Sequence, residues 1–290
     1  MGLSELFSKF GCWKFVSVRM AINWRKIAIG CLLGWMAMGC SEERLPQGVT
    51  VRIDDDLEVV RLTEHAYVYT AWSPIEGWGR VASNGLIVTD GGKALMVDSP
   101  MTSAQTESLV RWMEEKLKVR LESFVPGHWH SDCVGGMVWL NQQGVQTYAY
   151  EETNRILQTQ GKEPARTSFA DSLHLTVGDL PVGFYFFGGG HATDNIVAWF
   201  PADKVLFGGC MLKDTTTQQI GNVSDAASAL EWMQTVERLE ARFPMAEWVV
   251  PGHGPVGGVE IFGHTKKVIR EDYEPRETEA LSDTIALSGK

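Results

Sequence analysis

His128-Trp129-His130-Ser131-Asp132 is the stretch of this sequence that most constrains its fold and chemistry. It follows Phe124-Val125, a short apolar pair that we predict to be a strand leading straight into the cluster. Imidazole and carboxylate groups bind metals, and a spacing of two along an extended segment places residues 128, 130 and 132 on one side. The stretch therefore predicts a metal site at the end of a strand.

Three further ligand-type side chains follow predicted strands and glycines in the second half of the chain. They are His191 after Val182–Phe187, Cys210 after Val205–Phe207, and His253 after Trp248–Val250. Strand ends and their loops are where rigid folds place functional groups, and glycines permit the sharp turns that this requires. We expect these side chains to meet the first cluster at one edge of the fold. A lone His-x-His is weak evidence for a metal site, but the whole combination is hard to obtain by chance.

The residue types suit zinc, which accepts imidazole, thiolate and carboxylate ligands. One ion would be bound by His128, His130 and His191, and a second by Asp132, Cys210 and His253. Each site then has three protein ligands and an open position, which is the catalytic arrangement, whereas a structural zinc site is closed by four. The remaining histidines are expected to be ordinary surface or core residues: His65, His174 and His264.

The surrounding sequence predicts two half-sheets with helices outside them. Apolar alternation or short apolar runs predict strands at Val51–Tyr69, Gly85–Val88, Ala94–Val97, Leu173–Val177, Val182–Phe187, Ile196–Phe200, Val205–Phe207 and Trp248–Val250. Helical spacing and caps predict helices at Thr102–Lys118, Val134–Gln143, Glu151–Gln160, Asp225–Phe243 and Val259–Glu271. This order predicts an α/β fold in the form of a four-layer α/β/β/α sandwich.

We predict that residues 1–39 are a signal peptide. The apolar run Ile27–Gly39 follows two basic residues and is too short for a spanning helix. Met20 gives a normal basic start to this leader, in which case residues 1–19 are an annotation artefact. The small residues before Cys40 resemble a bacterial lipobox and predict a lipid on Cys40, although Ala37 replaces the usual Leu and leaves simple cleavage open. We therefore expect a periplasmic protein, anchored to the outer membrane if Cys40 carries a lipid.

Composition limits the remaining possibilities. Apolar residues make up 44% of the 290 residues, enough for one large core, and the net charge of −10 argues against nucleic acid as a partner. We expect a monomer with a linker at 40–50, one domain at 51–273 and a charged, loose tail at 274–290. With Cys40 lipidated, only Cys133 and Cys210 remain in that domain, so no disulfide framework is expected.

Several stretches occur together in one order, and their combination resembles a known family. They are Ser83–Val88, His128–Gly136, His191–Asn195, Phe207–Lys213, Gly221–Ala226 and Pro251–Gly254. From about Thr50 to Arg270, the chain resembles the class B β-lactamases of the first, di-zinc subclass. The resemblance implies the αββα metallo-β-lactamase fold and two zinc ions. It also implies opening of the lactam ring of penicillins, cephalosporins and carbapenems by a metal-bound hydroxide, which gives antibiotic resistance.

The resemblance also implies roles for individual residues, including the two ligand sets above. Asp132 would fix the second zinc and orient the nucleophile, Lys213 would pair with the substrate carboxylate, and Asn222 would help bind the lactam carbonyl oxygen. The loop Trp72–Arg80 would form an apolar flap through Trp72, Ile75 and Trp78. From the residues alone, Lys213 would be a solvated surface charge and the loop an ordinary hairpin tip.

Two positions depart from the family pattern. Gly127 stands where many relatives have Thr, which predicts looser support for a ligand. Cys133 follows Asp132 directly; we expect it to be inert at a helix start, with ligation of the second zinc or a bond to Cys210 as the alternatives.

Two other functions compete with the lactamase. One is a thioesterase of the glyoxalase II type, whose members tend to have His directly after the Asp and Asp at the later position. This chain has Cys133 and Cys210 at those two places. The other is a non-catalytic zinc-binding envelope lipoprotein, which the complete ligand set and Lys213 argue against.

Overall fold

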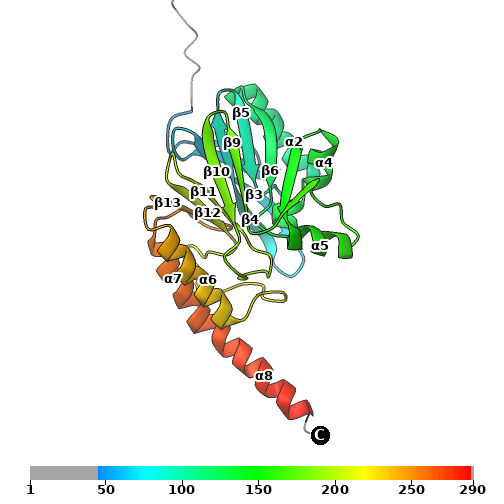
Figure 1. Cartoon of the computed structure of the whole chain (residues 1–290), viewed down its shortest axis with the longest axis vertical. Helices are drawn as coiled ribbons and strands as arrows, with labels where there is room; N and C mark the ends of the chain where they lie inside the picture. The colour runs from blue at the N-terminus through cyan, green and yellow to red at the C-terminus, as the bar shows by residue number, and fades with distance from the viewer. Residues whose placement is uncertain (1–44, 289–290) are drawn as a thin grey trace, which may run out of the picture. The chain divides into compact units, whose positions relative to one another are not determined.

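The computed structural model describes residues 45–288, and the predicted leader, the start at Met20 and the lipid on Cys40 lie outside them. No helix among the described residues has the length and hydropathy needed to cross a membrane. Two sheets form the centre of the fold, with helices on their outer faces (Figure 1).

The first sheet has eight strands in sequence order, from β1 to β8. They are β1 Thr50–Asp54, β2 Leu57–Arg61, β3 Ala66–Ile75, β4 Gly79–Asp90, β5 Lys93–Val97, β6 Arg120–Val125, β7 Gln146–Tyr150 and β8 Thr167–Phe169. β1 to β5 pair antiparallel, and β5 to β8 pair parallel through helical connections.

The second sheet has five strands in the order β13-β12-β11-β10-β9. They are β9 Ser172–Val177, β10 Leu180–Tyr185, β11 Val197–Phe200, β12 Val205–Gly209 and β13 Trp248–Pro251. β12 and β13 are parallel, so both strands end at the same edge of the sheet.

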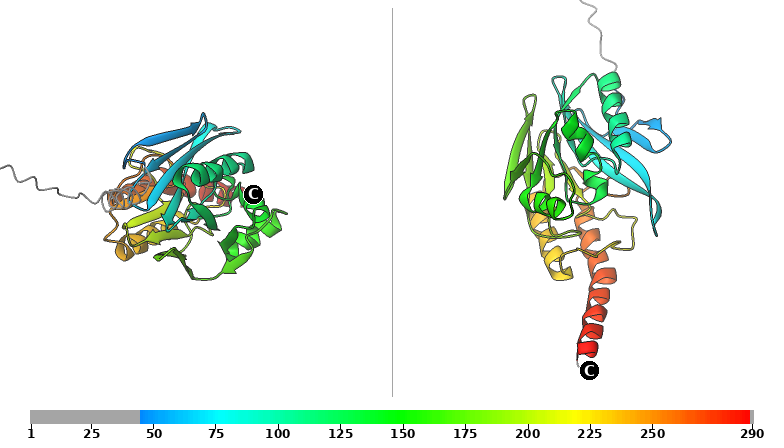
Figure 2. Two further views of the ribbon diagram at one scale, coloured as in Figure 1. Left: turned by 90° about the horizontal axis from the view of Figure 1, so that it is seen from above. Right: turned by 90° about the vertical axis from the view of Figure 1, so that its right-hand side faces the viewer.

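The helices are distributed over the two outer faces (Figure 2). Those following the first sheet's strands are α2 Ser103–Trp112, η1 Met113–Leu117, α3 Ser131–Val134, α4 Met137–Gln142 and α5 Glu151–Thr159. Those associated with the second sheet are α6 Ala229–Arg242, α7 Glu260–Val268, η2 Ile269–Tyr273 and α8 Glu274–Ser288.

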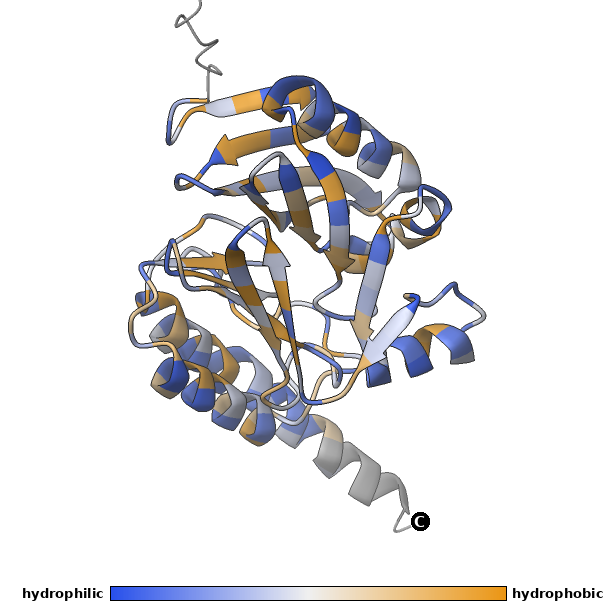
Figure 3. Ribbon diagram, turned by 45° about the horizontal axis from the view of Figure 1, so that its top comes forward, coloured by the Kyte–Doolittle hydropathy of each residue, from blue (hydrophilic) through white to orange (hydrophobic). Residues whose placement is uncertain are grey.

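Three hydrophobic cores separate four layers, which confirms the predicted α/β/β/α sandwich. Within β4, Ile87 packs in the core under α2 and α4, whereas Leu86 and Val88 pack in the core between the sheets. Within β12, Phe207 belongs to the central core and Leu206 to the core under α6 and α7. Both strands are therefore buried on both faces, and Figure 3 shows the hydropathy of their residues on the ribbon.

Two predicted helix boundaries were wrong. The expected helix Val134–Gln143 is broken into α3 and α4 at Gly135, where a Cβ atom would stand 2.1 Å from the backbone oxygen of Met101. The helix expected from Asp225 begins only at Ala229, because the side chain of Ser228 caps it by accepting from the Glu231 amide.

The C-terminal tail, expected to be loose, is regular. The segment 274–288 is the helix α8 rather than a loose tail, because its Glu, Ala and Leu residues are strong helix formers. For Trp72–Arg80, predicted as a loop or hairpin tip, the structure has the hairpin tip, and β3 and β4 stay paired as far as Ile75 and Gly79.

Candidate metal centre and substrate cavity

The six predicted ligands gather at one edge of the fold, where strands from both sheets end. His128 and His130 follow β6, Cys210 directly follows β12, and His253 lies two residues beyond β13. His191 comes from the loop between β10 and β11. Asp132 differs from the expectation of a continuous extended segment, because it lies in the first turn of α3.

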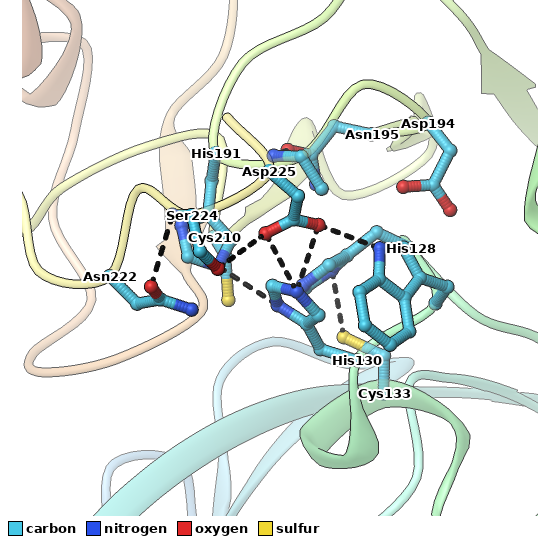
Figure 4. Close-up of polar contacts among 12 residues, drawn as sticks. His128, His130, Cys133, His191, Asp194, Asn195, Cys210, Asn222, Ser224 and Asp225 are labelled. Carbon is cyan, nitrogen blue, oxygen red and sulfur yellow. Dashed lines mark hydrogen bonds and ion pairs between the residues drawn. The ribbon is translucent and has the colours of Figure 1, made fainter. Parts of the chain in front are cut away.

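Three imidazoles form the first group of candidate ligands. The ligand atoms of His128, His130 and His191 lie within 4.8 Å of one another. Nδ1 of His130 and Nε2 of His191 are 3.1 Å apart (Figure 4). Nε2 of His128 is buried without a hydrogen-bond partner in the described part of the chain. A buried imidazole nitrogen without a partner is costly, and a shared cation would satisfy it.

A carboxylate, a thiol and an imidazole form the second group. Nε2 of His253 lies 3.3 Å from Oδ2 of Asp132 and 3.4 Å from Sγ of Cys210. The Cys210 sulfur is 3.7 Å from the same carboxylate oxygen. These atoms also lie within 4.8 Å of one another, so the structure brings together both predicted ligand sets.

The second ring nitrogens of two histidines, His130 and His253, are held by other groups. Nε2 of His130 is 3.1 and 3.2 Å from the two carboxylate oxygens of Asp225. Nδ1 of His253 is 2.6 Å from the backbone oxygen of Ala82. Such contacts fix the orientation of a metal-binding imidazole and select the nitrogen that faces the ion.

The local charges favour deprotonated ligands in the second group. Burial would raise the pKa of Asp132, but the hydrogen bond to His253 and the nearby imidazoles hold it below its usual range. The hydrogen bond with Cys133 holds the pKa of the Cys210 thiol well below its ordinary value, against the effect of burial. Because zinc binds thiolates and carboxylates, the donor sets and their charges fit this metal.

Cys133 lies at the start of a helix, as predicted, and it contacts both ligand groups. It is buried in α3, and both Cys133 and Cys210 are free thiols. Its sulfur lies 3.1 Å from Nδ1 of His128 (Figure 4). A side-chain hydrogen bond also links it to Cys210. It therefore acts on both ligand groups, and together with His128 and Asp132 it forms a third cluster of ligand-type atoms.

Gly127 supports the site through its backbone. Its amide donates to the buried carboxylate of Asp98, and a Cβ atom would stand only 3.1 Å from that carboxylate. The close approach explains why glycine fits here, and the looser support for a ligand stays a prediction.

A cavity of about 410 Å³ opens beside the two ligand groups. Its walls contain metal-ligand candidates, two lysines and an apolar rim. The lining residues are Ile75, Trp78, Val81, Trp129, His130, Ser131, Asp132, Lys162, His191, Lys213, Ile220, Gly221, Asn222, Ser224 and His253. A cavity of this size is in the usual range for a small-molecule site.

Four of the five predicted substrate-binding residues line this cavity, and Trp72 does not. Ile75 and Trp78 come from the tip of the β3–β4 hairpin, and Trp78 is 59% exposed. Trp72 and Ile75 are three residues apart on one strand, so their side chains point to opposite faces. The Trp72 ring instead lies against the guanidinium of Arg80.

Lys213 and Asn222 offer polar groups to the cavity. The ammonium of Lys213 lies 5.4 Å from the centre of the Trp232 ring, and burial lowers its pKa. Oδ1 of Asn222 accepts from the Ser224 amide at 3.1 Å. The side-chain nitrogen of Asn222 has no hydrogen-bond partner among the described residues, so it remains available as a donor.

Sequence reasoning missed Asp225, Lys162 and Val81. Asp225 was assigned to a helix, although its place three residues before the capping Ser228 was a signal that it precedes the helix. Lys162 and Val81 lie far from the ligand motifs in sequence, and no local pattern identifies them.

The remaining histidines lie outside both ligand groups, as expected. His65 pairs with Asp203, His174 contacts the Tyr185 hydroxyl, and His264 contacts the backbone oxygen of Thr217.

Comparison with known proteins gives consistent relatives. No family model matches the chain. The metallo-beta-lactamase type 2 of Bacteroides fragilis is 44% identical over 225 residues, which is 78% of this chain and 90% of that protein. The protein of the same name from Pseudomonas aeruginosa is 36% identical, over 72% of this chain and 83% of its own. The solved structure of TMB-1 is 39% identical with a TM-score of 0.71, covering 75% of this chain and 99% of that one.

Proposed function

This chain belongs to the type 2 metallo-beta-lactamase family, and from that premise we propose that it hydrolyses β-lactam antibiotics with two zinc ions. One observation carries the proposal. Two adjacent groups of three ligand-type side chains face a single cavity, and the same cavity contains Lys213. The substrates would be penicillins, cephalosporins and carbapenems, and their hydrolysis gives the bacterium antibiotic resistance.

The two groups would hold one zinc ion each with three ligands, and members of both groups line the cavity. Bound zinc would supply water of lowered pKa and would polarise the lactam carbonyl. Asp225 and the Ala82 carbonyl hold the rings of His130 and His253 in the orientation that this requires.

The protein's own groups position the substrate. Lys213 is a cation in a largely buried place and would bind the carboxylate on the substrate's fused ring. The free amide nitrogen of Asn222 would donate to the lactam carbonyl oxygen as negative charge develops there. Asp132 turns Oδ2 toward Cys210 and His253, and we assign its other oxygen to orienting the attacking water.

The flap supplies apolar contact with the substrate's side chain. Trp78 is largely exposed at the hairpin tip and Ile75 lies beside it in the cavity wall. Closing these side chains over a substrate would bury apolar surface and exclude water from the site.

The thioesterase alternative is disfavoured by the donor set. Besides Asp132 and His253, the second ligand group contains the sulfur of Cys210 where a thioesterase tends to have an Asp, and Cys133 occupies the place of the His that tends to follow the first Asp there. A non-catalytic zinc protein is disfavoured because the ligand groups line an open cavity instead of a closed, four-ligand centre.

We also propose the location and state of the protein. The leader supports export to the periplasm. The lipobox-like sequence at Cys40 supports a lipid on that residue, which would anchor the protein to the outer membrane. We propose that the protein is a monomer there. Labelled palmitate in the wild-type protein and its absence in Cys40→Ser would support the anchor. Unlabelled wild-type protein in the soluble periplasmic fraction would contradict it.

The central experiment combines hydrolysis and metal content on one sample. Purified protein is expected to hydrolyse nitrocefin, to lose activity in EDTA and to regain it with zinc at two ions per chain. His191→Ala should lose activity, while the matched control His174→Ala, outside both ligand groups, should keep it. The proposal fails if protein carrying two zinc ions hydrolyses no β-lactam.

A further inference from the structure

The substrate cavity contains a second lysine besides Lys213. Lys162 lies just beyond the end of α5, where Gly161 adopts a left-handed conformation with φ of 68°. The Lys162 amide donates to the Leu157 carbonyl at 2.9 Å, and the Gly161 amide donates to the Gln158 carbonyl at 3.0 Å. This hydrogen-bonded helix end fixes the backbone from which the Lys162 side chain extends.

The Lys162 side chain rests on a residue that is itself tied to the metal centre. Its ammonium lies 4.9 Å from the centre of the Trp129 ring. The Trp129 indole N–H donates to Asp225 at 2.7 Å, and the same carboxylate contacts Nε2 of His130. Cation–π contact favours this position of the ammonium. Lys162 is therefore placed beside the His130 end of the site.

Lys213 marks the other end. It follows Cys210 by three residues and lies against Trp232 rather than Trp129. Neither lysine forms an ion pair with a carboxylate of the described chain. The single acid in the cavity wall is Asp132, which belongs to the proposed zinc ligands. Asp225 lies beside Trp129 outside that wall, and its carboxylate is engaged by the Trp129 indole and by His130. An anionic ligand would thus meet two separated cations and, among the residues that line the cavity, no acid other than Asp132.

We propose that Lys162 is a specificity residue that binds a second acidic group, on the acyl side chain of the substrate. A penicillin or cephalosporin carries its ring carboxylate and its acyl side chain at opposite ends of the bicyclic nucleus. With the ring carboxylate on Lys213 and the lactam bond at the ligand groups, the side chain extends toward Trp129 and Lys162. The enzyme would therefore favour dianionic β-lactams. This inference rests on the proposed lactamase activity.

The expected effect is moderate because Lys162 is exposed to solvent. Exposed ion pairs contribute about 0.2–1 kcal/mol, which corresponds to a change of up to about fivefold. The effect should appear mainly in KM, since Lys162 does not contact the reacting bond, and it should shrink as salt is added.

The test compares two penicillins that differ by one carboxylate. Carbenicillin has an α-carboxylate on the benzyl side chain, and benzylpenicillin does not. The quantity measured is the ratio of their kcat/KM values for wild type, Lys162→Gln and Lys162→Glu. Lys116→Gln is the matched control, because it removes the same charge from an exposed lysine outside the cavity.

The ratio should fall by about two- to fivefold in Lys162→Gln and further in Lys162→Glu, through a higher KM for carbenicillin. It should stay at the wild-type value in Lys116→Gln. An unchanged ratio in both Lys162 variants, with benzylpenicillin still hydrolysed, overturns the role of Lys162 alone. If zinc-loaded wild type hydrolyses neither penicillin, the proposed function fails, and the inference fails with it.

Discussion

The carboxylate of Asp225 lies 3.1 and 3.2 Å from Nε2 of His130, although the two residues are 95 positions apart in sequence. Asp225 also accepts from the Trp129 indole, so one side chain holds both a candidate ligand and the cavity wall. Burial alone would lower the pKa of His130, but the hydrogen bond and charge of Asp225 raise it above its ordinary value. Asp225 thus orients His130 and increases its basicity.

Replacing Asp225 with Asn should weaken zinc binding by about 10- to 100-fold. The variant retains a hydrogen-bonding side chain but removes the charge that faces His130. Competition with a chelator would measure the affinity, and Asp171→Asn, at an exposed acid, is the control for loss of one charge. Equal zinc affinities for the two variants would show that Asp225 does not support the ligand.

The six candidate ligands were predictable because each one follows a strand or a glycine turn, which are features of local sequence. The role of Asp225 was not predictable, because the sequence around it fits the start of a helix. In the structure the helix is capped at Ser228, so Asp225 precedes it and turns toward His130. Trp72 was misplaced for a related reason. Placing it in the flap together with Ile75 ignored the alternation that puts Trp72 and Ile75 on opposite faces of a strand.

The four-layer fold was predictable because buried strands and amphipathic helices have clear periodicity. Cavity-wall residues such as Lys162 were not, since their position depends on packing between segments distant in sequence. Lys162 contacts Trp129, which is 33 positions earlier in the sequence. The contact depends on where α5 ends in space, and no sequence motif indicates it.

Replacing Cys133 with Ala should weaken metal binding at Asp132, Cys210 and His253. The hydrogen bond from Cys133 is the largest influence that lowers the pKa of Cys210. Without it, the Cys210 pKa rises, and an incoming ion must displace a proton at neutral pH. The thiolate absorption of Cd²⁺-loaded protein, followed from acid to neutral pH, should shift to higher pH. Cys133→Ser should shift less, and no shift in either variant would contradict the role.

The two cysteines are free in the structure, so untreated protein is expected to lack a Cys133–Cys210 bond. Mass spectrometry after alkylation without reductant should show both thiols labelled. A mass two hydrogens lower, with neither thiol labelled, would instead show the disulfide and a disrupted second ligand group.

Asp203 should stabilise the fold in a pH-dependent way. Its carboxylate accepts from Thr63 and from the His65 amide, and these hydrogen bonds hold its pKa below the usual value despite burial. A lowered pKa gives stability that is present above the unfolded value near 3.9 and is lost as pH falls through the folded value. Asp203→Asn should lose about 2 kcal/mol at pH 7. The difference from wild type in urea unfolding should shrink below about pH 4. A constant difference would exclude the charge as its source.

Trp78 and Trp72 provide a matched test of the flap, because they lie on the same hairpin but only Trp78 lines the cavity. Trp78 is 59% exposed, so its apolar surface is buried only when a substrate is present. Burial of part of this ring should contribute about 1–2 kcal/mol to substrate binding. Trp78→Ala should therefore raise the KM for benzylpenicillin about 5- to 30-fold, with a smaller change in kcat.

Trp72→Ala removes a ring that packs against Arg80, so it should lower the unfolding temperature and leave KM within about twofold. Equal KM values for the two variants would mean that the hairpin tip does not close over the substrate, since only Trp78 can lose a contact that forms on binding.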